Sequence, residues 1–234
     1  MTDPSVQVRP ARLGTARHHL AWLGAGLVLG FVVPFLFADV LQLPRDLYYG
    51  VYIAAVLVFF VLWARTTGRR LDVMVRRRWR SAVVLGLVIA LVLAFVVVRT
   101  EPATGGPQGL ALAWAVLWRG VAYGGADGLL LSAFPILAVF AAAEDSDLRQ
   151  RRSGTIAVGA VALLASMVMT TVYHLGYPDF RSPMLVRPVA ADVVWSVPTL
   201  VTLNPIGAPI AHAGLHVSAV LHSSETDVFL PPHR

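Results

Sequence analysis

The sequence predicts an all-α fold, a multi-pass bundle of transmembrane helices with about seven spans. Two observations of composition support this fold class: 57% of the 234 residues are hydrophobic, and only 14% are charged. A soluble domain carries roughly 25% charged residues, so this balance is typical of a membrane protein. The third observation is that apolar runs near bilayer-spanning length, about 20 residues, recur along the chain.

Five of these runs are long enough to cross a bilayer as helices. They are residues 20–42, 47–64, 81–98, 121–143 and 154–176. Two shorter runs, 189–203 and 206–222, meet at Asn204 and Pro205, a pair that favours a turn. We therefore expect these last two runs to form a short or re-entrant hairpin. Residues 108–119 are apolar but too short to cross, which places them at the membrane interface or in a re-entrant segment.

Arginine supplies all of the basic side chains that give the net charge of +6, because the chain contains no lysine, and it gathers outside the apolar runs. The clusters are Arg65, Arg69, Arg70, Arg76, Arg77, Arg78 and Arg80, then Arg149, Arg151 and Arg152, and, in the N-terminal tail, Arg9, Arg12 and Arg17. Counting the spans puts all three clusters on one side, which the positive-inside rule makes cytoplasmic. We therefore expect a multi-pass protein of a bacterial-type cell membrane with a cytoplasmic N-terminus.

The distribution of arginine along the chain also indicates what the protein binds. The lipid bilayer is the predicted partner, and arginines confined to short loops argue against binding of nucleic acid. The basic stretch "RRLDVMVRRRWR" (residues 69–80) is either a topology anchor alone or an interfacial helix that touches anionic head groups. The chain has no cysteine, which excludes disulfides, thiolate metal ligands and a cysteine nucleophile.

Ionisable side chains divide the chain into an apolar and a polar half. We expect a cytoplasmic tail (1–19), a three-span apolar half (20–107), a polar half (108–222) and a C-terminal tail (223–234). Ionisable groups at bilayer depth are costly and mark a functional interior. The three predicted spans of the apolar half offer only Asp39, near the end of a run. The polar half contains Asp127, His174, Asp192, His212, His216 and His222.

His212 and His216 are four residues apart, so a helix places both imidazoles on one face. That spacing suits two ligands of one divalent metal ion. The alternative is structural, with each imidazole bonded to a backbone carbonyl or a hydroxyl. The sequence therefore does not decide between these alternatives, and a divalent metal ion is the candidate cofactor.

Two segments resemble motifs of the CPBP family of intramembrane proteases, which includes CAAX-processing and bacteriocin-immunity-type membrane proteins. The family reads EExxxR, then FxxxH, then HxxxN. "TTVYH" (170–174) resembles the second motif with Thr in place of Phe, and "HAGLH" (212–216) resembles the third with His in place of Asn. The resemblance covers roughly residues 120–222. It implies that His174 helps to activate a water molecule and that His212 and His216 stabilise an oxyanion.

The first motif has two candidate positions. "EDSDLR" supplies Glu144, Asp145 and Arg149, with Asp in place of the second Glu. "WAVLWR" keeps Arg119 but has Trp and Ala where both glutamates stand in the family. A third possibility is that the acid comes from the group of Asp127, His174, Asp192 and His216, which share the outer half of the predicted bundle.

The resemblance implies an intramembrane peptidase-like hydrolase or a relative that has lost catalysis. The candidate catalytic residues are then His174, His212, His216, Glu144, Asp145 and Arg149. The residues alone leave two alternatives: a non-catalytic membrane subunit or scaffold that contacts another membrane protein, and a transporter of protons or small molecules.

Overall fold

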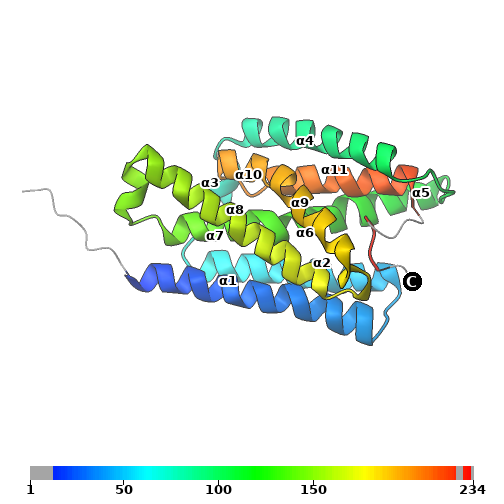
Figure 1. The fold of residues 1–234 in the computed structure, drawn as a ribbon, viewed down its shortest axis with the longest axis horizontal. Coiled ribbons are helices and arrows are strands. Elements are labelled where there is room, and N and C mark those ends of the chain that lie inside the picture. The colour runs from blue at the N-terminus through cyan, green and yellow to red at the C-terminus, as the bar shows by residue number, and fades with distance from the viewer. Residues whose placement is uncertain (1–12, 225–228, 233–234) are drawn as a thin grey trace, which may run out of the picture.

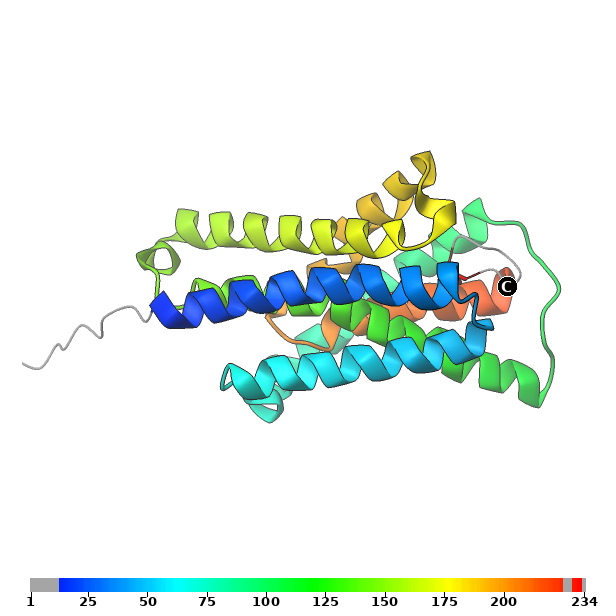
Figure 2. The ribbon, with the colours of Figure 1, turned by 90° about the horizontal axis from the view of Figure 1, so that it is seen from below.

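The computed structural model describes residues 13–224 and 229–232, and every regular element in these residues is helical. The long helices lie side by side along one axis and form an elongated bundle (Figures 1 and 2). Arg9 and Arg12, and most of the expected N-terminal tail, lie outside the described residues.

Six helical segments of the described chain are long and apolar enough to cross a membrane, which bears out the multi-pass helical bundle. They are Ala16–Val40, Arg45–Thr66, Trp79–Thr100, Leu110–Ala142, Arg152–Leu175 and Pro183–Thr202. The first comprises most of α1 (Leu13–Val33) and a π-helical turn at Pro34–Val40, and the next three long helices are α2 (Arg45–Thr66), α4 (Trp79–Thr100) and α8 (Arg152–Leu175).

The structure differs from the expectation for residues 108–119. This stretch is not a separate interfacial or re-entrant segment, because it forms the beginning of the 33-residue helix Leu110–Ala142. That helix comprises α5 (Leu110–Ala115), α6 (Gly124–Gly128) and α7 (Phe134–Ala142), with the π-helical segments Val116–Tyr123 and Leu129–Ala133 between them. At 1.5 Å per residue it is about 50 Å long, which exceeds the apolar thickness of a bilayer, about 30 Å.

The predicted turn at Asn204 and Pro205 is present. It joins α9 (Val186–Trp195) and α10 (Val197–Thr202) to α11 (Gly207–His222). Leu203 ends α10 in the left-handed region at φ 52°. α11 has 16 residues, fewer than a full crossing needs, as the short length of that run predicted.

Small residues allow α11 to pack closely on its neighbours. A Cβ added to Gly86 of α4 would lie 2.9 Å from the carbonyl oxygen of Gly207 at the start of α11. Such backbone approach is the usual way in which membrane helices associate.

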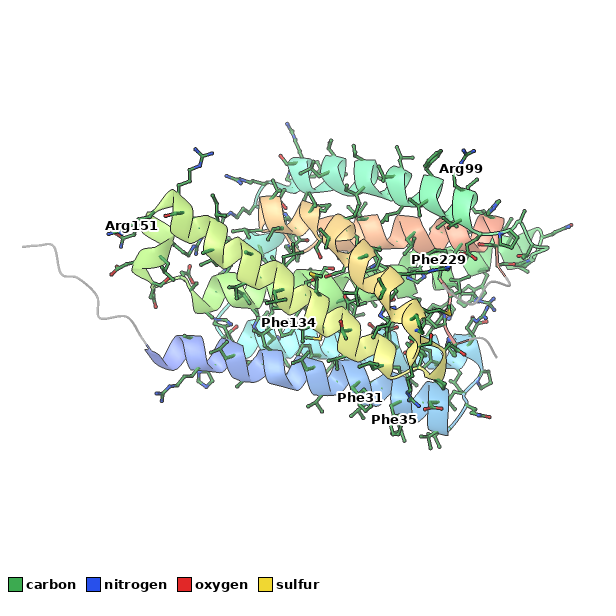
Figure 3. The ribbon with its side chains drawn as sticks, viewed as in Figure 1. Phe31, Phe35, Arg99, Phe134, Arg151 and Phe229 are labelled. Carbon is green, nitrogen blue, oxygen red and sulfur yellow. The ribbon has the colours of Figure 1, made fainter. Side chains whose placement is uncertain are left out.

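The outer surface of the bundle carries large apolar side chains. Phe31 and Phe35 stack on the outside of the helical segment Ala16–Val40, whereas Phe134 is enclosed by the bundle (Figure 3).

The arginine-rich loops lie at one end of the bundle, with the start of α1. An ion pair of 2.5 Å between Arg69 and Glu144 joins the loop after α2 to the loop after α7. Arg151 and Arg99 lie near opposite ends of the molecule (Figure 3). We call the end that holds Arg69 and Arg151 the basic end, and the other the distal end. The predicted orientation would put the basic end in the cytoplasm.

Candidate functional site

Glycines bring the middle of the long helix Leu110–Ala142 into backbone contact with α11. A Cβ on Gly128 would lie 2.7 Å from the carbonyl oxygen of Ala208, and one on Gly124 would lie 2.9 Å from Cδ2 of His216. The "GGADG" sequence of α6 therefore allows a close approach that larger residues would prevent. Asp127, between these two glycines, faces α11 as a result.

Two π-helical segments flank α6, one on each side of this contact. They span Val116–Tyr123 and Leu129–Ala133. Each wider turn rotates the residues that follow it relative to a regular α-helix, and such turns are frequent at functional sites. In this chain they enclose the stretch that carries Asp127.

The carboxylate of Asp127 lies close to the imidazoles of both His212 and His216. Its Oδ2 atom is 3.4 Å from Nε2 of His216 and 3.6 Å from Nε2 of His212. All three side chains are buried, with exposed fractions of 3–4%. The two imidazoles stack with ring centroids 5.0 Å apart. One ligand atom from each side chain falls within 4.8 Å of the others.

These distances do not describe hydrogen bonds. A charge-assisted N–H···O bond measures about 2.7–2.9 Å, and both separations are longer. Within the described residues, Oδ1 of Asp127, Nδ1 of His212 and both ring nitrogens of His216 have no hydrogen-bond partner. Buried polar atoms are nearly always bonded, so this group leaves several donors and acceptors for a further species.

A cavity of about 360 Å³ opens beside the three residues. Its polar lining includes Asp127, His212, His216 and His174, and its apolar lining includes Leu215 of α11 and Val96 of α4. Phe229, which also lines it, lies near the distal end of the bundle (Figure 3). A mostly apolar cavity with a few converging polar groups is the usual form of a ligand or active site.

His174 is held in a defined tautomer at the end of α8. Its Nδ1 atom is 2.8 Å from the carbonyl oxygen of Thr170, which can only accept, so Nδ1 carries the hydrogen. In the neutral ring Nε2 is then a proton acceptor. His174 therefore contributes a basic nitrogen to the lining of the cavity.

A second buried carboxylate, that of Asp192 on α9, is connected to the site through Trp195. Its Oδ1 atom accepts hydrogen bonds from the indole of Trp195 at 2.6 Å and from three hydroxyl groups at 3.0–3.1 Å, those of Ser132, Ser166 and Ser196. Trp195 packs on His212 with ring centroids 4.4 Å apart. Asp192 thus fixes an aromatic ring that in turn supports one histidine of the site.

All six tyrosines of the chain lie buried in one cluster next to this site. They are Tyr48, Tyr49, Tyr52, Tyr123, Tyr173 and Tyr177. The hydroxyls of four of them, Tyr48, Tyr123, Tyr173 and Tyr177, form a network in which Tyr173 contacts Tyr123 at 2.5 Å and Tyr177 at 2.8 Å. Tyr123 meets His216 edge to face, with centroids 5.1 Å apart. The cluster therefore forms a rigid wall against one histidine of the site.

The structure brings three of the six predicted catalytic residues together and separates the other three from them. His174, His212 and His216 line one cavity. Glu144, Asp145 and Arg149 lie at the basic end, beyond the start of α8. The 24 residues of α8 put about 36 Å between that end and His174. Glu144 is instead paired with Arg69, so "EDSDLR" does not supply an acid to the histidines.

The acid at the site is Asp127, which the sequence offered only as one of several substitutes. Glu101 and Arg187, which also line the cavity, were not singled out from the sequence. The tyrosine cluster had a partial signal, because Tyr48 and Tyr52, and likewise Tyr173 and Tyr177, are four residues apart within apolar runs. Such spacing puts each pair on one helix face.

No family model, curated protein or solved structure matches this chain. The chemistry that the site can perform therefore follows from its own geometry. That geometry is a buried group of one aspartate and two histidines in a helical protein of membrane type.

Proposed function

We propose that the protein is an intramembrane hydrolase that holds a divalent metal ion, of which zinc is the best match, with Asp127, His212 and His216. The observation that carries the proposal is the position of Asp127 Oδ2, 3.4 and 3.6 Å from two imidazole nitrogens. Ligands about 2.0–2.1 Å from a tetrahedral zinc ion are about 3.3–3.5 Å apart. Both distances from Asp127 are close to that separation and too long for direct hydrogen bonds, and all three ligand atoms lie within 4.8 Å of one another.

The type of ligand supports the same ion class. Two imidazoles and a carboxylate are a common set for catalytic zinc, and three protein ligands leave a fourth position open. The open cavity beside the group gives that position room for a water molecule or a substrate. A divalent ion bound there would acidify a coordinated water and polarise a carbonyl group.

His174 is the proposed general base. Its Nε2 atom accepts a proton from the attacking water as the water oxygen bonds to the carbonyl carbon of an amide or ester. The same proton then passes to the nitrogen or oxygen of the leaving group as the carbon–heteroatom bond breaks. The products are a carboxylic acid and an amine or alcohol, so one water is consumed and the histidine is regenerated.

The resemblance to the CPBP proteases supports hydrolysis, and the three proposed residues His174, His212 and His216 occupy its second and third motifs. The glutamate pair of the first motif has no counterpart in the cavity. We propose that Asp127 and the ion replace it. The apolar lining from Val96 and Leu215 suits a substrate that lies in the membrane, either a peptide segment or an acyl chain.

The metal content of the purified protein tests the first half of the proposal. The full-length chain is incubated with zinc in detergent, desalted and analysed by mass spectrometry of the elements. We expect one zinc ion per chain in the native protein and its loss in D127N and H216Q. H222Q is the matched control, because His222 lies on the same helix but bonds to the carbonyl oxygen of Glu101 at 3.1 Å.

Hydrolysis tests the second half. Zinc-loaded protein in liposomes is given p-nitrophenyl octanoate and a quenched fluorescent transmembrane peptide as separate probes. H174Q should retain zinc and lose at least 100-fold in rate, since a general base contributes about 10²–10⁴-fold. H18Q, at an exposed position of α1, is the control. Zinc binding without hydrolysis of either probe would favour the non-catalytic alternative.

A further inference from the structure

The basic end of the bundle holds a second hollow that the proposed function does not use. It measures about 720 Å³ and lies among the end of α2, the short helix α3 (Leu71–Arg76) and the loop after α7. Its polar lining includes the guanidinium-bearing residues Arg69, Arg70, Arg77 and Arg149, against a single glutamate, Glu144. Such an excess of arginine selects for an anion.

Two of the four arginines already have carboxylate partners. Arg69 is paired with Glu144 at 2.5 Å, and Arg70 with Asp72 at 2.8 Å. Within the described residues, Arg77 and Arg149 have no ion pair, and the guanidinium carbon of Arg149 lies 5.6 Å above the ring of Phe140. Packing of one guanidinium face on a ring leaves the N–H groups at its edge available.

Hydrogen bonds from a buried side chain fix the backbone at the rim of the hollow. The side-chain amide of buried Asn204 donates to the carbonyl oxygens of Val75 at 2.8 Å and Arg77 at 2.5 Å. Arg78 then turns the chain into α4 with a left-handed backbone at φ 47°. Because α3 is anchored through its last turn, Arg77 is presented at a fixed place rather than on a loose loop.

The other residues around the hollow are apolar, among them Trp63, Met74 and Phe140. α3 buries none of its own residues and leaves Val73 51% exposed, as expected for a helix at the membrane surface. An arginine-rich rim over an apolar wall matches a ligand with a phosphate group and an adjoining hydrocarbon part.

We propose that this hollow binds a phosphate group through Arg77 and Arg149, with an anionic phospholipid head group as its source. The sequence stretch "EDSDLR", which supplies no acid to the histidines, then has a role through Arg149. Arg149 lies before the start of α8 and His174 near its end, and the hollow shares no lining residue with the cavity of His174, so the proposal does not depend on the proposed hydrolysis.

Titration of the full-length protein in a neutral detergent tests this site. Phosphatidylglycerol, phosphatidylcholine and inorganic phosphate are added separately, and the shift in Tm and the number of bound lipids by native mass spectrometry are recorded. A ligand that binds the folded state raises Tm with concentration. We expect saturable binding of phosphatidylglycerol, and loss of about tenfold or more in affinity in R77Q/R149Q, since charge-assisted hydrogen bonds are lost.

The matched control is R76Q/R80Q, which removes the same charge from the same end but from residues outside the lining of the hollow. This variant should bind as the native protein does. Saturable binding of inorganic phosphate alone, lost in R77Q/R149Q, would support the site and identify a soluble phosphate as its ligand. Equal weakening in both double variants, or no saturable binding of any probe, would overturn the proposal.

Discussion

Trp195 packs on His212 with ring centroids 4.4 Å apart, and its indole nitrogen donates to Asp192 at 2.6 Å. The contact links Asp192 to Asp127, the two buried aspartates in the described part of the chain, because His212 also faces Asp127. A ring fixed in this way limits the orientations of His212. Outer groups that orient metal ligands typically change metal affinity by about 10–100-fold when they are removed.

W195L should therefore weaken zinc binding by about tenfold or more without removing the three ligands. The measurement is a competition titration with a zinc chelator. W114L is the control, because Trp114 is exposed on α5, where it stacks on Trp118 away from the site. Unchanged zinc affinity in W195L would show that His212 does not depend on the indole.

Asp192 should be important for stability as well. D192A removes the acceptor of the Trp195 indole and of the Ser132 and Ser196 hydroxyls, while Ser166 keeps the carbonyl oxygen of Leu131 as an acceptor. The substitution should lower the free energy of unfolding by about 3 kcal/mol or more, since each unsatisfied buried group costs about 1–3 kcal/mol. Reversible unfolding in mixed micelles measures the loss. D147A, in the exposed loop before α8, should change it little. A similar small effect of both substitutions would contradict the importance of the Asp192 network.

Gly124 and Gly125 form a matched pair that tests the close contact of α6 with α11. A Cβ on Gly124 would lie 2.9 Å from both Cα of Ala213 and Cδ2 of His216, whereas one on Gly125 would meet nothing within 4 Å. G124A should cost about 1–3 kcal/mol through overpacking and should lower zinc content. G125A should be neutral, or stabilising by up to about 1 kcal/mol. Normal zinc content in G124A would mean that His216 is not held against this helix.

The tyrosine hydroxyls give a further matched pair. The hydroxyl of Tyr173 contacts two other hydroxyls, while that of buried Tyr49 has no partner among the described residues. Y173F should cost about 1–2 kcal/mol, since it breaks a buried network. Y49F should have no cost, since it removes an unsatisfied group. Thermal unfolding of the two variants compares them, and equal effects would argue against the network.

The fold was largely predictable from hydropathy, because a bilayer imposes its length on every crossing helix. The five long runs and the turn at Asn204 and Pro205 are present, and the arginine clusters of residues 65–80 and 149–152 lie at one end. Residues 108–119 were misjudged because a length rule treats each apolar run by itself. The π-helical segments beside α6 allow that run to continue into the next, and no hydropathy pattern marks them.

The site was predictable only where its residues share a helix. The spacing of His212 and His216 puts both on one face of α11, as expected. Their acid partner depends on which helix packs against that face, and this depends on the glycines at 124 and 128. The sequence therefore offered Asp127, Asp192 and Glu144 as alternatives, while the packing brings only Asp127 into one group with His212 and His216.

X-ray absorption spectroscopy at the zinc edge of the zinc-loaded protein tests the proposed centre most directly. The account predicts nitrogen and oxygen neighbours at about 2.0–2.1 Å, with the outer-shell signal of two imidazoles. H216Q should give no spectrum of protein-bound zinc, because it should lose the ion, and H222Q should keep the full signal of two imidazoles. A spectrum without imidazole neighbours, or one that H216Q leaves unchanged, would contradict a metal held by Asp127, His212 and His216.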